Sequence, residues 1–202
     1  VTDNSSPIID CFNQTIVFNG EDAIDLDPLD LVTATDNCSI ASTVLSPNYI
    51  SCEQLGEEVP IEITVTDASG NPSTCTVLVM VDGLPCGFSQ DPDGVNCVEG
   101  SSASYDPISE AFTLSSTNCY YGSPFTVDEA AFVGTELCGD SEIIVEISST
   151  TGLAWAGLHF RETMAANSKK FSLASNGSNF ARREVRSQTG GAAFPQQIPA
   201  FG

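Results

Sequence analysis

The sequence predicts an all-β protein made of small sandwich domains, and three observations support that prediction. Apolar and polar residues alternate along short runs, most clearly at 61–66, and strict alternation is typical of half-buried strands. Turn residues separate these runs at intervals of about 8–15 residues, a spacing typical of β-sandwiches. No segment before residue 160 shows helical periodicity.

The expected strands follow one another along the chain. Three short runs come first, at 8–11, 15–18 and 30–34. Two longer runs, 61–66 and 74–81, flank the turn-forming residues 67–72, so we expect them to pair as a hairpin. The runs 143–147 and 155–161 alternate in the same way and are also predicted to be strands.

The chain is strongly acidic, and its charge is unevenly distributed. Its 202 residues hold 27 Asp and Glu against 6 Lys and Arg, a formal net charge of -21. Such a surface repels nucleic acid, so we expect no nucleic-acid partner. All six cations lie within 161–186. The repulsion among the acids before them must therefore be screened by salt or bridged by divalent cations such as calcium.

Eight cysteines are spread over the first two thirds of the chain. None forms a C-x-x-C pair and there is one histidine, so a zinc site is not favoured. An even number in an acidic, strand-patterned chain predicts disulfides and an extracellular location. Two bridges in each half are the simplest arrangement, and each set of four allows three connectivities. The cysteines are Cys11, Cys38, Cys52, Cys75, Cys86, Cys97, Cys119 and Cys138.

A domain boundary is predicted near 82–87. Asp, Pro and Cys occur in that order within 82–86 and again within 3–11, about 80 residues apart, as expected of tandem repeats. The apolar run 77–81 is far short of the ~20 residues that span a bilayer, so no membrane span is expected. The expected parts are the tail of a preceding repeat, a first domain, a linker and a second domain, at 1–3, 4–82, 83–86 and 87–202.

Three stretches of the first domain form a family pattern: PIIDC at 7–11, ATDNC at 34–38, and ITVTDASGN at 63–71 followed by a cysteine. In these stretches residues 4–82 resemble the hyalin-repeat (HYR) branch of immunoglobulin-like domains, found in very large secreted bacterial surface proteins. The resemblance implies a bridge from Cys11 to Cys75, between the first and last strands, and a local bridge from Cys38 to Cys52.

The second domain carries stretches of another pattern, at 100–106, 112–114, 139–147 and 155–162. Through them residues 87–202 resemble a concanavalin-like (laminin-G-like) jelly roll that lacks its C-terminal strands. We therefore expect the continuing chain, or strand exchange with another subunit, to complete the sheet. The chain departs from this family at two cysteines, which suggests an added Cys119–Cys138 bridge and leaves Cys86 to pair with Cys97.

Two clusters in the second domain are candidate binding sites. Asp91, Asp93 and Asn96 offer oxygen ligands for calcium around a glycine, although ordinary turns have the same composition. The acidic run 25–30 of the first domain is a weaker candidate of the same kind.

The second cluster is Arg182, Arg183 and Arg186. On a strand, Arg182 and Arg186 share one face and Arg183 lies opposite. The arginines are interpreted either as an ordinary mixed surface or as a docking patch for acidic regions of a neighbouring domain or subunit.

No catalytic residues are predicted. Glu142 and Glu146 would lie about 13–14 Å apart on one strand, beyond the ~5–9.5 Å of a glycosidase pair. Trp155 is interpreted as a core residue, with a sugar-stacking platform as the alternative.

The sequence therefore predicts a non-enzymatic, structural or adhesive segment of a large secreted surface or filament protein. The resemblance also implies export by a type IX-like route and a place at the cell surface. The expected partners are other subunits or neighbouring repeats of the same protein, together with glycans or a target cell surface. The alternative is a carbohydrate-binding accessory region of a secreted glycan-degrading enzyme.

Overall fold

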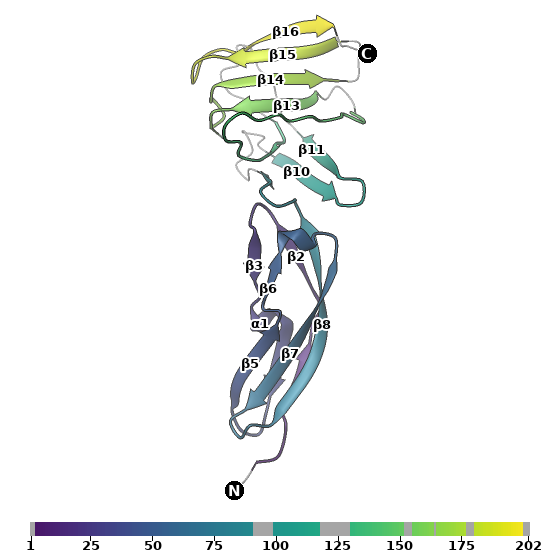
Figure 1. Cartoon of the computed structure of the whole chain (residues 1–202), viewed down its shortest axis with the longest axis vertical. Coiled ribbons are helices and arrows are strands. Elements are labelled where there is room, and N and C mark those ends of the chain that lie inside the picture. The colour runs from purple at the N-terminus through teal and green to yellow at the C-terminus, as the bar shows by residue number, and fades with distance from the viewer. Residues whose placement is uncertain are drawn as a thin grey trace. The chain divides into compact units, whose positions relative to one another are not determined.

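The structure, a computed structural model, describes residues 3–90, 99–117, 130–151, 155–163, 165–176 and 180–199. This part of the chain is all-β, as predicted, and contains one short α-helix (Figure 1). The chain divides into two compact units, the first comprising 1–89 and 104–113 and the second 90–103 and 114–202. Among the described residues, no helix is both long and apolar enough to cross a membrane.

The first unit is built on a four-stranded sheet in the order β2-β8-β7-β5. Strand β2 runs parallel to β8, and the other neighbours are antiparallel. Two further antiparallel pairs are β1–β4 and β3–β6. The elements are β1 Ile8–Cys11, β2 Gln14–Phe18, β3 Ala23–Asp25, α1 Pro28–Leu31, β4 Val32–Thr35, β5 Ile40–Ser46, β6 Tyr49–Ser51, the 3-10 turn η1 Cys52–Gln54, β7 Glu58–Asp67 and β8 Pro72–Gly83.

Strands β7 and β8 pair as an antiparallel hairpin, which confirms the predicted pairing of 61–66 with 74–81. The core of the first unit lies on one face of this hairpin. Every second side chain of the two strands points inward, as the alternation requires. Burying each apolar side chain among them contributes about 1.5–3 kcal/mol to the stability of the fold. The apolar ones that are at most 2% exposed are Ile61, Ile63, Val65, Val77, Val79 and Val81.

One predicted strand of the first unit is partly wrong. Residues 30–34 were expected to be extended, but α1 occupies 28–31 and the strand begins only at Val32. The reason is local: the Asp27 carboxylate accepts a hydrogen bond from the Leu29 amide at 2.9 Å, and Pro28 occupies the first turn. Both residues favour a helix start over a strand.

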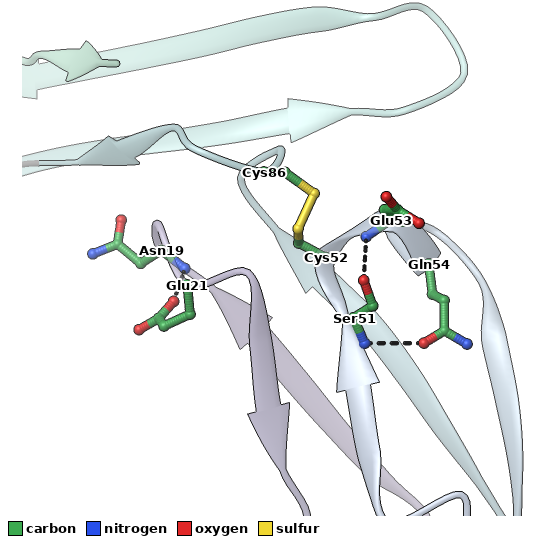
Figure 2. The surroundings of a disulfide bond; sticks show 7 residues. All are labelled: Asn19, Glu21, Ser51, Cys52, Glu53, Gln54 and Cys86. Atoms are coloured by element: carbon green, nitrogen blue, oxygen red, sulfur yellow. Dashed lines mark hydrogen bonds between the residues drawn. A yellow bond between two sulfur atoms is a disulfide. The ribbon is translucent and has the colours of Figure 1, made fainter. Parts of the chain in front are cut away.

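Two disulfides link parts of the first unit. The bridge between Cys11 and Cys75 ties the end of β1 to β8 and confirms one predicted pairing. The second joins Cys52, at the start of η1, to Cys86, just beyond β8 (Figure 2). A capping box at Ser51 and Gln54 shapes the η1 turn. The Gly56 amide then donates to the Val81 carbonyl at 2.8 Å, so the turn lies against the end of β8.

The other predicted pairings are corrected by this second bridge. Cys52 bonds to Cys86, so neither Cys38–Cys52 nor Cys86–Cys97 is formed. Cys38 precedes the seven-residue strand β5, whose ~23 Å length separates it from the η1 turn. Cys38 and Cys138 carry free, exposed thiols, so the predicted Cys119–Cys138 bridge is not formed either. Cys97 and Cys119 themselves lie outside the described residues.

The second unit is organised around a four-stranded antiparallel sheet in the order β13-β14-β15-β16. A separate hairpin pairs β10 with β11; its tip, 104–113, is the part that belongs to the first unit. The remaining elements are β9 Ser89–Gln90, β10 Glu99–Asp106, β11 Ala111–Thr117, β12 Val133–Gly134, β13 Ala156–Arg161, β14 Lys170–Ser175, β15 Phe180–Arg186 and β16 Phe194–Pro199.

The predicted strand at 143–147 does not form. Residues 135–151 have no strand assignment, and Ile144 is 84% exposed. The residues alternate suitably, but none of the described strands pairs with this segment. Alternation alone cannot supply the ladder of hydrogen bonds that makes a strand.

Candidate metal centre and buried charged network

Asp3, Asp36 and Cys38 meet at one end of the first unit. Their potential ligand atoms all lie within 4.8 Å of one another. Asp3 precedes β1, whereas Asp36 and Cys38 lie in the turn between β4 and β5. The β7–β8 turn holds Asp3 in this position, because the side-chain amide of Asn71 donates to the Asp3 carbonyl at 3.3 Å.

The Asp3 carboxylate is held in its ionised form. Its pKa is lowered, first by the Ser5 backbone amide and then by the thiol of Cys38 and the side chain of Asn37. The Ser5 and Asn37 nitrogens donate to Oδ1 at 3.0 and 3.3 Å. Its Oδ2 is buried, and no N–H or O–H donor of the described residues reaches it. An ionised carboxylate in this position, with the Cys38 thiol as its neighbour, suits a cation.

The Cys38 thiol is held in its protonated form. Its pKa is raised, first by a hydrogen bond to Asp3, then by loss of solvent and by the negative charges of Asp3, Asp36 and Asp67. A thiol becomes a strong metal ligand only after losing its proton. The group could bind a metal ion, and in its resting state the carboxylates of Asp3 and Asp36 are the available ligands.

Asp67 lies near this cluster and has a structural role. Its carboxylate is 1% exposed and accepts hydrogen bonds from the Ser69 amide at 2.9 Å and from the Asn71 amide at 2.8 Å. Burial raises its pKa, but hydrogen bonds from Asn71, Ser69 and Gly70 outweigh burial, so the pKa is lowered overall. Asp67 thereby fixes the turn that brings Asn71 to Asp3.

The sequence indicated calcium elsewhere. Asp91, Asp93 and Asn96 lie outside the described residues, so that site stays a prediction. Within the described chain, the run 25–30 forms no such group of ligands, and its Asp27 caps α1 instead. Sequence reasoning missed the observed cluster because Asp3 was assigned to a preceding repeat. The ATDNC motif places Asp36 and Cys38 together, but only the fold adds Asp3.

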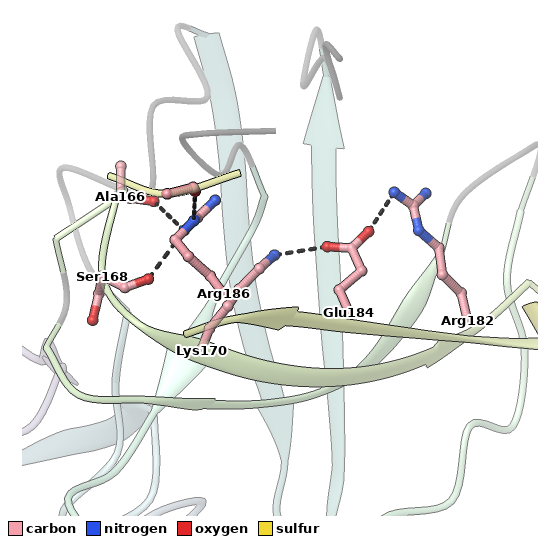
Figure 3. A network of polar contacts seen from close by, with 7 residues as sticks. Ala166, Ser168, Lys170, Arg182, Glu184 and Arg186 are labelled. Carbon is pink, nitrogen blue, oxygen red and sulfur yellow. Dashed lines mark hydrogen bonds and ion pairs between the residues drawn. The ribbon is translucent and has the colours of Figure 1, made fainter. Parts of the chain in front are cut away.

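A second polar site lies on the inner face of the second unit's sheet (Figure 3). Lys170 of β14 contacts Glu184 of β15 at 2.8 Å, and their side chains are 0% and 4% exposed. Arg182 forms an ion pair with the same carboxylate. Arg186 donates to the carbonyls of Ala166 and Ser168, both at 3.1 Å. The buried charges are thus matched by opposite charges or by carbonyl groups.

The opposite face of this sheet is apolar and exposed. Phe160, Phe171, Val185 and Phe194 are cross-strand partners in one continuous row from β13 to β16. Their side chains are 42%, 42%, 46% and 68% exposed. The sheet therefore turns Lys170, Glu184 and Arg186 inward and this apolar row outward.

The predicted arginine cluster is divided between these two faces. Arg182 and Arg186 lie on the inner face and Arg183 on the outer, as strand geometry predicted. Arg186 is 1% exposed, and the Arg182 guanidinium lies 5.7 Å from the centre of the Trp155 ring. Arg183 is exposed and donates to Gln196 of β16. A docking role for the cluster stays a prediction. Of its three arginines, Arg183 is the one exposed to a binding partner.

The other candidates lie apart from any large cavity of the described chain. A small cavity beside Trp155, His159 and Glu184 has room for about one water molecule. Glu142 and Glu146 lie in the segment without a strand and are exposed. Their predicted separation therefore no longer applies, because it assumed a strand.

The chain is a mostly-β, disulfide-bonded protein with several small sheets. Two disulfides are consistent with a secreted protein. Comparison with protein-family models, curated proteins and solved structures finds no match to this chain.

Proposed function

We propose that this chain is a non-enzymatic structural and adhesive segment of a large secreted surface or filament protein, with an immunoglobulin-like first unit and a jelly-roll-like second unit. The strand order supports the first assignment, because β5, β7 and β8 are neighbours as strands C, F and G are in immunoglobulin sandwiches. The four-stranded antiparallel sheet is compatible with part of a jelly roll.

The observation that carries the adhesive role is the exposed apolar row on the second unit. An apolar sheet face of this kind is typically covered by a second sheet or by a partner. We assign the cover to another subunit or a neighbouring repeat of the same protein. Export by a type IX-like route belongs to the same proposal and rests on the sequence resemblance alone.

Sedimentation of the purified chain over a range of concentrations tests this proposal. We expect concentration-dependent association, and we expect Phe171→Asp to abolish it by placing a charge in the row. Val44→Asp is the matched control, since Val44 is 57% exposed on the first unit. A chain that stays monomeric at every concentration contradicts the proposed partner.

The alternative is a carbohydrate-binding accessory region, and the aromatic members of the same row favour it. Phe160, Phe171 and Phe194 could stack on sugar rings, which present apolar faces. Retention of the monomeric chain by an insoluble polysaccharide, lost in Phe171→Asp but not in Val44→Asp, would favour this alternative. Release of sugars from that polysaccharide would contradict both non-enzymatic functions.

We further propose that Asp3 and Asp36 bind a cation and that this cation is calcium. The carboxylates of Asp3 and Asp36 are hard oxygen ligands of the kind calcium prefers. Calcium should raise the unfolding temperature of the first unit, and chelator should reverse the rise. Asp36→Asn should lose this effect, whereas Asp25→Asn, on β3 away from the cluster, should keep it.

The thiol distinguishes calcium from a softer metal. Cys38→Ser should retain a calcium effect, because calcium needs no thiolate. A zinc effect lost in Cys38→Ser would show instead that a softer metal uses the sulfur. No change in unfolding temperature with either metal contradicts the proposed cation site.

A further inference from the structure

The two disulfides of the first unit create a short covalent route across it. Cys11 lies where β1 ends, and its bond to Cys75 leads directly into β8, the last strand of the unit. Strand β8 then runs to Gly83, and Cys86 follows just beyond it. A pull on the two ends of the unit therefore passes from Cys11 through sulfur to Cys75 and along β8.

We infer that the first unit is a force-bearing segment whose extension is limited covalently. This inference rests on the proposed structural role, because only a chain under tension uses such a limit. The Cys11–Cys75 bond encloses a sequence separation of 64 residues. At ~3.3–3.6 Å per residue, this bond withholds about 210–230 Å of chain from extension even when the unit unfolds.

The chain that remains in the route is short. From Cys75 to Cys86 it covers about 11 residues, or about 36–40 Å when fully extended. The core strands β5 and β7 lie within the enclosed loop. Unfolding the core under tension would therefore lengthen the unit little, and the core could refold from a nearly unextended state.

The Cys52–Cys86 bond limits the extension of the unit only after the Cys11–Cys75 bond is lost. While Cys11–Cys75 is intact, the route through Cys52 is the longer one and carries no load at full extension. If the first bond is lost, the load passes from Cys11 along the chain to Cys52 and through sulfur to Cys86. The second bond then withholds its own separation of 34 residues, or about 110–120 Å.

Single-molecule stretching of the full chain between terminal handles tests this inference. Cys52→Ala with Cys86→Ala should leave the released length unchanged, because the shorter route remains. Cys11→Ala with Cys75→Ala should add about 100 Å, and loss of all four cysteines about 210–230 Å. Differences between variants remove the contribution of the second unit, which is common to all of them.

A measurement on the unmodified chain covers the case in which a variant fails to fold. Held under force with a thiol reductant, the first unit should lengthen either in two steps of about 100 Å and 110–120 Å, or in one step of their sum if the unloaded bond is cleaved first. A unit that releases its full length before reductant is added overturns the inference, as does lengthening caused by the Cys52 and Cys86 changes alone.

These outcomes are independent of the proposed function. A chain that fails to associate, or that binds polysaccharide, would contradict the adhesive role without altering any released length. The lengths depend only on which cysteines are bonded.

Discussion

The sheets of the two units bury opposite kinds of side chain. In β7 and β8 most of the inward residues are Ile and Val, so the first unit is stabilised by removing apolar surface from water. In β14 and β15 the inward residues include Lys170, Glu184 and Arg186, while Phe171 and Val185 face outward. Both sheets follow the same two-residue alternation, so periodicity identifies the strands but does not say which face is buried.

The difference has an energetic consequence. Desolvating a buried ion pair costs about as much as the pairing returns, so such a pair contributes little net stability compared with apolar residues of the same volume. The second sheet therefore gains less from its inner face than the first sheet gains from its core. Covering the outer apolar row would supply what the inner face does not, which agrees with the proposed partner.

The largest expected loss of stability comes from removing an acid from the buried charged network of the second unit. Glu184→Gln removes the acid that pairs with Lys170 and Arg182, and the lost pairing of buried charge should cost about 3–5 kcal/mol. Urea unfolding followed by fluorescence of Trp155, the chain's one tryptophan, reports on this unit directly. Replacing both partners, Lys170→Met with Glu184→Gln, should cost less than Glu184→Gln alone. Equal stability of Glu184→Gln and wild type would contradict the account of the inner face.

The next effect compares an inward and an outward apolar residue. Ile63→Ala empties a fully buried site in β7 and should cost about 2–5 kcal/mol. Phe171→Ala removes a larger side chain from the exposed row and should cost less than about 1 kcal/mol in the isolated chain. Hydrogen exchange of the β7 and β14 amides measures each unit separately. A larger loss for Phe171→Ala would mean that the outer row is buried in solution.

The same contrast explains how much the sequence could predict. The β7–β8 hairpin and the Cys11–Cys75 bond follow from alternation and a family pattern. The Cys52–Cys86 bond does not, because it depends on the η1 turn lying against the end of β8. The Asp3 cluster also depends on tertiary structure, since Asp3 is positioned by Asn71, which is distant in the sequence. At 143–147 alternation was present, but no described strand supplied the pairing.

A smaller effect contrasts two kinds of buried acid. Glu184 is paired with cations, whereas Asp67 relies on hydrogen bonds from Ser69 and Asn71. Because the folded pKa of Asp67 is lowered, its contribution is present above the unfolded value of about 3.9 and is lost as the pH falls through the folded pKa. The first unit should therefore melt at lower temperature below pH 4. Asp67→Asn should flatten this dependence, and an unchanged acid profile in that variant would contradict it.

The smallest effect is expected at the tip of the β10–β11 hairpin. Asp106 is exposed and accepts hydrogen bonds from the Ile108 amide at 3.0 Å and the Ser109 hydroxyl at 2.5 Å. The Ser109 hydroxyl is the first cause of its lowered pKa, followed by the Ile108 amide. The sign is the same as for Asp67, so the turn should loosen only as the pH falls below about 4. Titration of both carboxylates by NMR should place each below the ordinary value. Ser109→Ala should raise the pKa of Asp106 and leave Asp67 unchanged, because the two turns share no hydrogen bond. If Ser109→Ala moved neither pKa, the hydroxyl would not be what lowers the pKa of Asp106, and the turn would depend on its backbone amide alone.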